Sequence, residues 1–168
     1  TLYTTESQLA KFELNKPWNF TEAGALPKVS LTSFKALVWF ANARHWQEKM
    51  NITILILGGS GGTGSMGIQM ARHFGAKEII TTTSAANADY VTSLGATQVI
   101  DYHTENWYDV LSDYSVDVIY DCVGTSGTAD YAMRKLRQDG YFVTIAGSLS
   151  KNTTRTDVTQ SFFINSDT

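Results

Sequence analysis

The sequence predicts an α/β protein: a Rossmann-type, doubly wound parallel sheet of six strands with helices on both faces. Two observations support this fold class. From Thr53 onward, short apolar runs alternate with segments of helical periodicity, which is the pattern of chained βα units. In addition, the glycine-rich stretch GSGGTG at residues 59–64 directly follows the first apolar run. Because crossovers between parallel strands are right-handed, we expect the spatial strand order 3-2-1-4-5-6.

Length and composition are those of an ordinary globular protein. The chain has 168 residues, of which 43% are hydrophobic and 17% charged, and this favours one domain with its own core. The net charge of −3 and the lack of a Lys/Arg cluster argue against binding to nucleic acid. No apolar run approaches the roughly 20 residues that span a bilayer, so we expect no membrane partner.

The cysteine and histidine content predicts neither a disulfide nor a metal site. Cys122 is the single cysteine of the sequence, and the three histidines lie far apart, which is unlike a structural zinc cluster. A lone cysteine favours a reducing compartment. We therefore expect a cytoplasmic protein, or one of an organellar matrix if a transit segment was removed upstream.

The first predicted helix covers residues 30–46, where apolar side chains recur at helical spacing and Ser30 is a candidate N-cap. Residues 1–28 fit the βα pattern poorly and are expected to be strand and loop. The first strand, at 53–59, is a β-branched apolar run bounded by glycine, as in a fully buried strand. The next helix, at 65–74, follows from Met66, Met70 and Phe74, which recur every fourth residue.

The remaining elements continue the alternation. A strand at 76–84 ends in hydroxyl side chains, and a helix at 86–94 ends at Gly95, a typical C-terminal stop. Further apolar runs predict strands at 97–102, 116–124, 140–147 and 159–165. Helical periodicity predicts helices at 104–114 and 128–138, the latter with Ala132, Met133 and Leu136 on one face.

Within the glycine-rich stretch, Gly59, Gly61 and Gly64 form a G-x-G-x-x-G motif between a predicted strand and a predicted helix. In such motifs the first glycine makes a tight turn, the second lets the backbone approach a pyrophosphate, and the third lets helix and strand pack closely. The helix N-terminus then offers free amides to the phosphates. The alternative is a glycine-rich turn that packs a helix on a sheet and binds nothing.

The cofactor expected from the second strand is NADP(H). Domains that prefer NAD carry an acid at the end of this strand, whereas this strand ends in Thr81, Thr82, Thr83 and Ser84. Hydroxyls can donate hydrogen bonds to a 2′-phosphate, and an acid would repel it. A cationic partner is missing, because no Lys or Arg lies between positions 77 and 134.

The ensemble of motifs resembles the medium-chain dehydrogenase/reductase superfamily, in its zinc-independent, quinone-oxidoreductase-like branch. The matching stretches are EAGALPKVSLTSFKAL (22–37), ILGGSGGTGSMGIQMA (56–71), SLGATQVIDY (93–102), DVIYDCVG (117–124) and GYFVTIAG (140–147). The chain departs from the family at Gly59 and Gly67, where many relatives carry alanine, and at Thr63, where they carry valine.

The resemblance implies a two-domain protein. Residues 1–28 look like the remnant of a GroES-like catalytic domain, and residues 29–168 look like the NAD(P)-binding Rossmann domain. The implied reaction is NADPH-dependent hydride transfer to a quinone or to an α,β-unsaturated carbonyl, with no catalytic acid or base assigned. An enoyl reductase module of a fatty-acid or polyketide synthase and a non-catalytic nucleotide-binding scaffold remain alternatives. We expect this chain alone to bind cofactor without turnover.

The resemblance also implies residue roles along the cofactor. At the pyrophosphate these are Gly59, Gly61, Gly62, Thr63 and Gly64. Ser84 is expected at the 2′-phosphate or, alternatively, as a helix cap, and Asn87 stands where relatives often carry a phosphate-binding lysine. Tyr102 is expected to close over the adenosine phosphate, with a half-buried structural aromatic as the alternative.

At the other end of the cofactor, Thr32 matches a threonine near the nicotinamide, with first-turn helix polarity as the alternative. Val123 and Gly124 are expected to line the nicotinamide ribose. Ala146, Gly147 and Ser148 are expected to hold the carboxamide through backbone groups. Cys122 is expected to be an inert strand residue.

A homodimer is expected through the last strand. Phe162, Phe163 and Ile164 lie in the predicted sixth strand at the sheet edge, and an exposed apolar edge favours strand pairing. In the family that the sequence resembles, this strand often pairs across a two-fold axis, which predicts an isologous interface.

Overall fold

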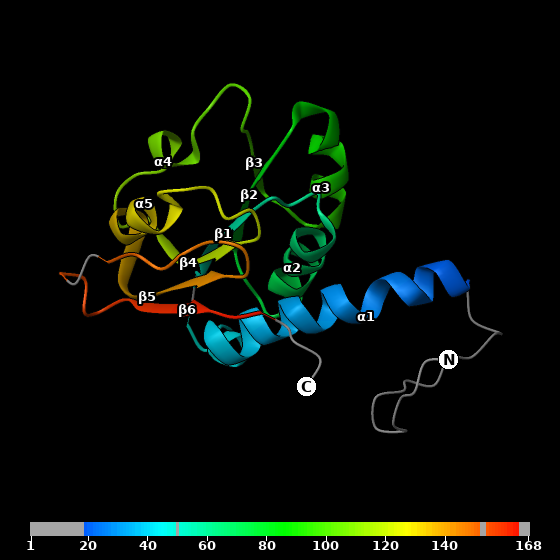
Figure 1. Ribbon diagram of the computed structural model, residues 1–168, viewed down its shortest axis with the longest axis horizontal. Helices are drawn as coiled ribbons and strands as arrows, with labels where there is room; N and C mark the ends of the chain where they lie inside the picture. Colours follow the sequence, from blue (N-terminus) through cyan, green and yellow to red (C-terminus); the bar gives the residue numbers. More distant parts are fainter. Residues whose placement is uncertain (1–18, 50, 152–153, 165–168) are drawn as a thin grey trace.

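The computed structural model describes residues 19–49, 51–151 and 154–164. It contains a six-stranded sheet in the order β3-β2-β1-β4-β5-β6, and every adjacent pair is parallel (Figure 1). The strands are β1 Thr53–Leu57, β2 Glu78–Thr83, β3 Gln98–Asp101, β4 Val116–Asp121, β5 Leu136–Thr144 and β6 Thr159–Phe162. The predicted fold class and strand order are therefore confirmed.

Helices cover both faces of the sheet (Figure 1). They are α1 Phe20–Phe34, the π-helix η2 Lys35–Phe40, the 3₁₀ turns η3 Ala43–His45 and η4 Ala85–Asn87, α2 Gly62–His73, α3 Ala88–Leu94, α4 Trp107–Val110 and α5 Thr128–Lys135. No helix among the described residues is long and apolar enough to cross a membrane.

The sheet separates two apolar clusters, which explains the continuous apolar run of β1. Ile54 and Ile56 belong to the cluster that contains residues of η2, α2 and α3. Leu55 and Leu57 belong to the other, which contains residues of α4 and α5. Successive side chains of a strand point to opposite faces, and a strand covered on both sides is apolar throughout.

The first helix starts earlier than predicted. It begins at Phe20 rather than at position 30, because Asn19 and Glu22 form a capping box with hydrogen bonds of 2.9 and 2.8 Å. Ser30 lies inside the helix and does not cap it. The prediction of strand and loop is wrong for residues 20–28, and residues 1–18 lie outside the described part of the chain. The first turns of α1 are mostly exposed and extend away from the sheet (Figure 1).

Several boundaries in the second half also differ. The helix predicted at 104–114 is the short α4. The helix predicted at 128–138 ends at Lys135, and Leu136 pairs with Val116 as the first residue of β5. The β4–β5 register shifts between Val116 and Val118, and Asp139 adopts a positive φ of 59° beyond this pair. The shift lets Leu136 join the core before the regular part of β5 begins.

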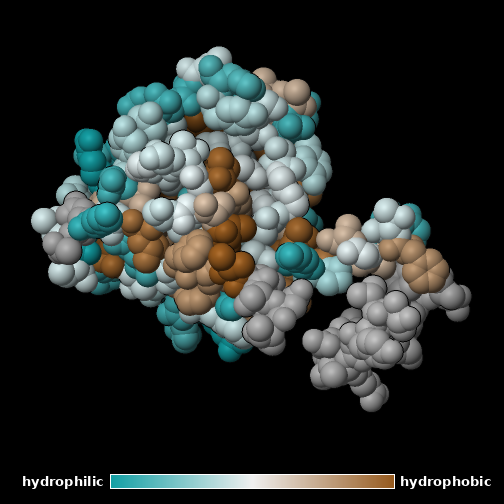
Figure 2. Space-filling view, viewed as in Figure 1, coloured by the Kyte–Doolittle hydropathy of each residue, from teal (hydrophilic) through white to brown (hydrophobic). Residues whose placement is uncertain are grey.

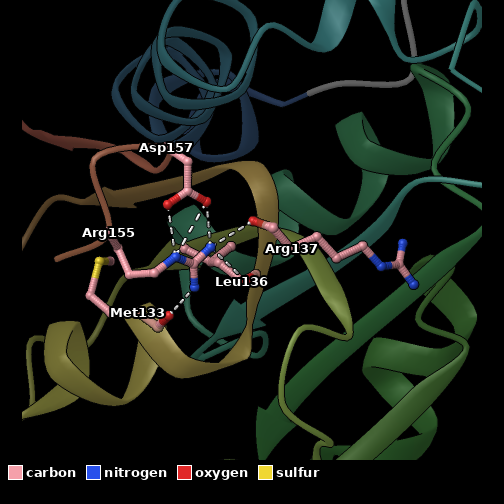
Figure 3. A network of polar contacts seen from close by, with 5 residues as sticks. All are labelled: Met133, Leu136, Arg137, Arg155 and Asp157. Atoms are coloured by element: carbon pink, nitrogen blue, oxygen red, sulfur yellow. Dashed lines mark hydrogen bonds and ion pairs between the residues drawn. The ribbon is translucent and has the colours of Figure 1, made fainter.

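The loop between β5 and β6 is tied to the end of α5 by Arg155 (Figure 3). One guanidinium nitrogen of Arg155 donates to the carbonyls of Leu136 and Arg137, both at 3.1 Å, and to Asp157 at 2.8 Å. The other terminal nitrogen donates to the Met133 carbonyl. Carbonyls at a helix C-terminus lack intrahelical partners. Arg155 satisfies that of Met133 in α5 and those of Leu136 and Arg137 just beyond it, and so anchors the loop.

Candidate functional site

The candidate site lies at the edge of the sheet where the strands end. In a parallel sheet the carboxyl ends of all strands meet at one edge, and ligands bind there where the strand order reverses. In this sheet that position is between β1 and β4, which are neighbours but not consecutive. The loops that follow β1, β2, β3, β4 and β5 all emerge at this edge.

The tight turn of the glycine loop is made by Gly58, not by Gly59 as the motif predicts. Gly58 has a φ of 79°, and its amide donates to the Thr82 hydroxyl at 3.0 Å. At Gly59 the requirement is space, because a Cβ there would overlap the Thr81 hydroxyl. At Gly64 a Cβ would overlap the Gly58 carbonyl, as expected for the glycine that brings helix and strand together.

Gly61 differs from these positions because the fold leaves room for a side chain there. Its φ of −72° and ψ of 163° suit any L-residue, and a Cβ there would meet only the Gly58 carbonyl, 3.4 Å away. Gly61 is the N-cap of α2, and no side chain caps this helix. The first amides of α2 thus lack intrahelical partners and receive no side-chain cap, an arrangement that fits a pyrophosphate.

Helix α1 packs against the same loop. The Ser33 hydroxyl donates to the Thr63 carbonyl at 2.8 Å, and a Cβ on Gly62 would lie 3.0 Å from Val29. Thr32 is buried and donates to the Lys28 carbonyl at 2.7 Å, so it lies deep in α1 and not in its first turn. The sequence motif identified neither Val29 nor Ser33, since both read as ordinary helix positions.

The hydroxyls at the end of β2 are mostly turned inward. Thr81 donates to the Ile56 carbonyl at 2.7 Å, and Thr83 donates to the Ser60 hydroxyl at 2.9 Å. Both residues are buried, as is Thr82. These threonines join β2 to β1 and to the glycine loop, so of the four hydroxyl residues that end the predicted strand, three are engaged inside the fold. The hydroxyl that remains near the surface is that of Ser84.

Ser84, Asn87 and Tyr102 lie on loops joined by Asp101. The Ser84 oxygen accepts from the Asn87 amide at 3.1 Å and does not cap η4. Asp101 takes that place, because its carboxylate accepts from the Ala85 amide at 3.2 Å and from the His103 amide at 3.0 Å. Tyr102 is 59% exposed and lies beside the His103 ring. Asp101, an acid at the end of β3, was not predicted as part of the site.

On the other side of the reversal point, the structure brings the loops after β4 and β5 together. The buried Asp121 accepts at one oxygen from the amides of Val123 and Gly124, at 3.0 and 2.9 Å. Its other oxygen accepts from the Thr144 hydroxyl at 3.0 Å. Thr144 in turn accepts from the Gly147 amide at 2.9 Å.

The pair formed by Asp121 and Thr144 was not predicted, because both residues lie inside the segments predicted as strands, 116–124 and 140–147. The signal was present in the sequence: a charged and a polar residue directly follow the apolar stretches 118–120 and 141–143, inside two runs that are mostly apolar. Such residues are rarely fully buried without hydrogen-bonded partners.

Cys122 has no nucleophilic character in this setting. Burial raises the pKa of its thiol to about 12, so the thiolate is scarce near neutral pH.

The described residues contain no group of three or more His, Cys, Asp or Glu side chains arranged to hold a metal ion.

Comparison with known proteins identifies relatives of this fold and sequence. Residues 62–167 match the family model described as zinc-binding dehydrogenase. The 2-methylene-furan-3-one reductase of Solanum lycopersicum is 36% identical over 140 residues, which cover 80% of this chain. The chloroplastic NADPH-dependent alkenal/one oxidoreductase of Arabidopsis thaliana is 34% identical over 138 residues, again 80% of this chain.

Among solved structures, the quinone oxidoreductase of Coxiella burnetii superposes with a TM-score of 0.72 at 27% identity, over 89% of this chain and 45% of that one. The chain spans about a third of the length of the two curated relatives, 33% of each. The family model covers most of the chain, and both relatives match across the glycine loop. The chain therefore belongs to the zinc-binding dehydrogenase family, within the medium-chain dehydrogenase/reductase superfamily that its sequence resembles.

Proposed function

We propose that the chain is the NADP(H)-binding part of a zinc-independent oxidoreductase that reduces quinones or α,β-unsaturated carbonyls. The observation that carries this proposal is the uncapped start of α2 behind an open Gly61, at the point where the strand order reverses. The cofactor supplies the hydride, and the protein binds it, orients it and keeps water away.

The pyrophosphate is proposed to lie against the backbone of Gly61, Gly62, Thr63 and Gly64, with Gly59 keeping the loop close to β2. Helix N-termini bind phosphates through free amides and a partial positive charge. Ser33 supports this role indirectly, since its bond to the Thr63 carbonyl fixes the first turn of α2 against α1.

The preference for NADP(H) rests on Ser84 and Asn87. No acid ends β2, and the Ser84 oxygen already accepts from the Asn87 amide. The Ser84 hydrogen is therefore directed elsewhere and suits a phosphate oxygen. Tyr102, exposed on the neighbouring loop, is proposed to cover the adenosine phosphate. The name of the Arabidopsis relative, an NADPH-dependent oxidoreductase, supports the same preference.

The nicotinamide is proposed to lie over the loops after β4 and β5. Val123 and Gly124 would line its ribose, and Ala146, Gly147 and Ser148 would hold its carboxamide. Figure 2 shows apolar side chains gathered over the ends of β4, β5 and β6. Val123, which follows β4, is 54% exposed, and Leu149, which follows β5, is 41% exposed. An apolar surface suits hydride transfer, which must exclude water.

We also propose an isologous homodimer through β6, which is the edge of the sheet. Phe162 and Ile164 are 47% and 68% exposed, as such an interface requires. Phe163 is buried and stacks on Phe40 with 5.0 Å between ring centroids, so it belongs to the core and not to the interface.

We propose that residues 1–28 belong to a GroES-like domain and residues 29–168 to the NAD(P)-binding domain. We place the whole protein, as a proposal, in the cytoplasm or in an organellar matrix.

Calorimetric titration with NADPH and NADH tests the cofactor. We expect NADPH to bind more tightly, and equal or tighter binding of NADH contradicts the proposal.

Turnover is then measured for this chain and for a longer form that carries the GroES-like domain. The substrates are a small quinone, an enone and an enoyl thioester. We expect turnover in the longer form. A marked preference for the thioester favours the enoyl reductase alternative, and cofactor binding without turnover favours the scaffold.

A further inference from the structure

The buried Asp121 is satisfied by the loops on which the nicotinamide is proposed to lie. Its carboxylate is fully buried, and its hydrogen-bond donors are the amides of Val123 and Gly124 and the hydroxyl of Thr144. A buried carboxylate needs such partners. The conformation of the loop after β4 is therefore tied to the position of one side chain.

Thr144 transmits the same constraint to the loop after β5. Its hydroxyl has one hydrogen to donate, and this hydrogen goes to Asp121. The lone pairs of its oxygen then face the amides of Ala146 and Gly147, which donate to it at 3.3 and 2.9 Å. Because the Asp121 carboxylate can only accept, it determines which group donates and which accepts in each of these hydrogen bonds.

The two loops are also in direct contact. Gly124 has a φ of 78°, and a Cβ on it would overlap the Ala146 carbonyl. A Cβ on Gly147 would lie 3.0 Å from the Asp121 carboxylate and 3.1 Å from the Gly124 backbone. Neither loop can move far without the other, so the hydrogen bonds of Asp121 and Thr144 set the shape of both.

We infer that Asp121 and Thr144 are positioning residues that hold the nicotinamide half of the cofactor site in its binding shape without touching the cofactor. This inference rests on the proposed function, because it takes the loops of Val123–Gly124 and Ala146–Ser148 as the nicotinamide side. It predicts an effect on one half of the dinucleotide only, since Ser84 and Asn87 lie on other loops.

The experiment compares NADPH with 2′,5′-ADP, which carries only the adenosine half, in calorimetric titrations of the full protein. Thr144→Val is expected to weaken the binding of NADPH about tenfold, which corresponds to the loss of roughly one hydrogen bond. It should leave the binding of 2′,5′-ADP unchanged. Thr144→Ser is expected to restore NADPH binding. Thr53→Val is the matched control, because Thr53 is also buried and donates to Glu78 from the opposite edge of the sheet; it should change neither affinity.

A loss of both ligands to the same extent, or no loss of NADPH, overturns the inference. If the unmodified protein binds neither ligand, the proposed function itself fails. Should Thr144→Val not fold, hydrogen–deuterium exchange of the unmodified protein decides: the amides of Val123, Gly124 and Gly147 are expected to exchange slowly before any ligand is added. Fast exchange at these amides contradicts the role of the pair.

Discussion

The carboxylate of Asp121 accepts a 3.0 Å hydrogen bond from the hydroxyl of Thr144, and both side chains are fully buried. The two residues are also direct partners in the β4–β5 register. Their side-chain bond therefore joins positions that the sheet already holds together, so little conformational entropy opposes it. The loops that follow them start from a rigid base, as a binding site requires.

Gly61→Val is expected to abolish dinucleotide binding without unfolding the protein. The backbone of Gly61 accepts an L-residue, and a Cβ there would make only an ordinary contact of 3.4 Å. The added side chain would instead fill the space in front of α2. Titration with NADPH and a thermal melt measure the two effects. A lowered melting temperature that accompanies the loss of binding would point to a structural defect instead.

Gly59→Ala is expected to be rescued by Thr81→Ala. A Cβ on Gly59 would overlap the Thr81 hydroxyl, and overpacking of this kind costs about 1–3 kcal/mol. Removing that hydroxyl relieves the overlap, while Thr81 Cβ and Ile68 Cδ1 stay 3.0 Å from the new methyl group. The rescue should therefore be partial, and the two changes should couple in a double-mutant cycle of urea unfolding. Additive effects of the two changes would show that the clash relaxes elsewhere.

The stabilising effect of Asp157 is expected to depend on pH. Arg155 donates hydrogen bonds to Asp157 and lowers the pKa of this carboxyl below its ordinary value of 3.8 (Figure 3). A folded-state pKa below the unfolded-state value means that the pair stabilises the fold above the unfolded value, about pH 4. This stabilisation is lost as the pH falls through the folded-state pKa.

Thermal melts of the unmodified protein and of Asp157→Asn measure this dependence. The difference in melting temperature should be largest near neutral pH and should shrink below about pH 4. A difference that stays constant across this range would assign the effect of the substitution to packing and not to charge.

Ile164→Lys is expected to convert a homodimer into a monomer. Ile164 follows the edge strand β6 and is 68% exposed, so a lysine there should leave the fold intact while it disfavours edge pairing. Tyr90→Lys, at a 48% exposed position on α3, is the matched control. Light scattering at micromolar concentration gives the mass. A monomer before substitution contradicts the proposed dimer, and Phe163 is unsuitable for this test because it is buried.

The alternation of apolar runs was sufficient to predict the sheet, its order and the place of the glycine loop. Periodicity reports which side chains must be covered, and six apolar runs, the first five of them joined by helices, leave few topologies. Element ends were predicted less well. The start of α1 depends on the capping box of Asn19 and Glu22, a local signal that the apolar pattern does not contain.

Within the site, the residue types were predicted more reliably than their partners. The open position of Gly61 follows from the motif, but the inward turn of Thr81 and Thr83 depends on which side of β2 faces the glycine loop. Asp121 and Thr144 are ten or more positions from any predicted phosphate contact and gain their importance only when β4 and β5 pair. Such long-range relationships are not encoded in any single stretch of sequence.

Ser84→Asp is expected to reverse the cofactor preference. A carboxylate at the end of β2 would repel the 2′-phosphate of NADPH and could accept hydrogen bonds from the ribose hydroxyls of NADH. Ser84→Ala removes only the donated hydrogen bond, and a hydrogen bond to a charged group is worth about 1.5–3 kcal/mol. We therefore expect Ser84→Ala to weaken NADPH alone, while Ser84→Asp weakens NADPH further and strengthens NADH.

Titrations of the three proteins with NADPH, NADH and 2′,5′-ADP measure these effects. The ADP derivative carries the 2′-phosphate without the nicotinamide, so it should follow NADPH in every variant. Asp101 lies on the adjacent loop with its oxygens accepting from the amides of Ala85 and His103, and Ser84 is the neutral side chain whose hydroxyl is proposed to donate to the 2′-phosphate. If Ser84→Asp binds NADPH as tightly as the unmodified protein does, the 2′-phosphate lies elsewhere, and the assignment of NADP(H) to the end of β2 is wrong.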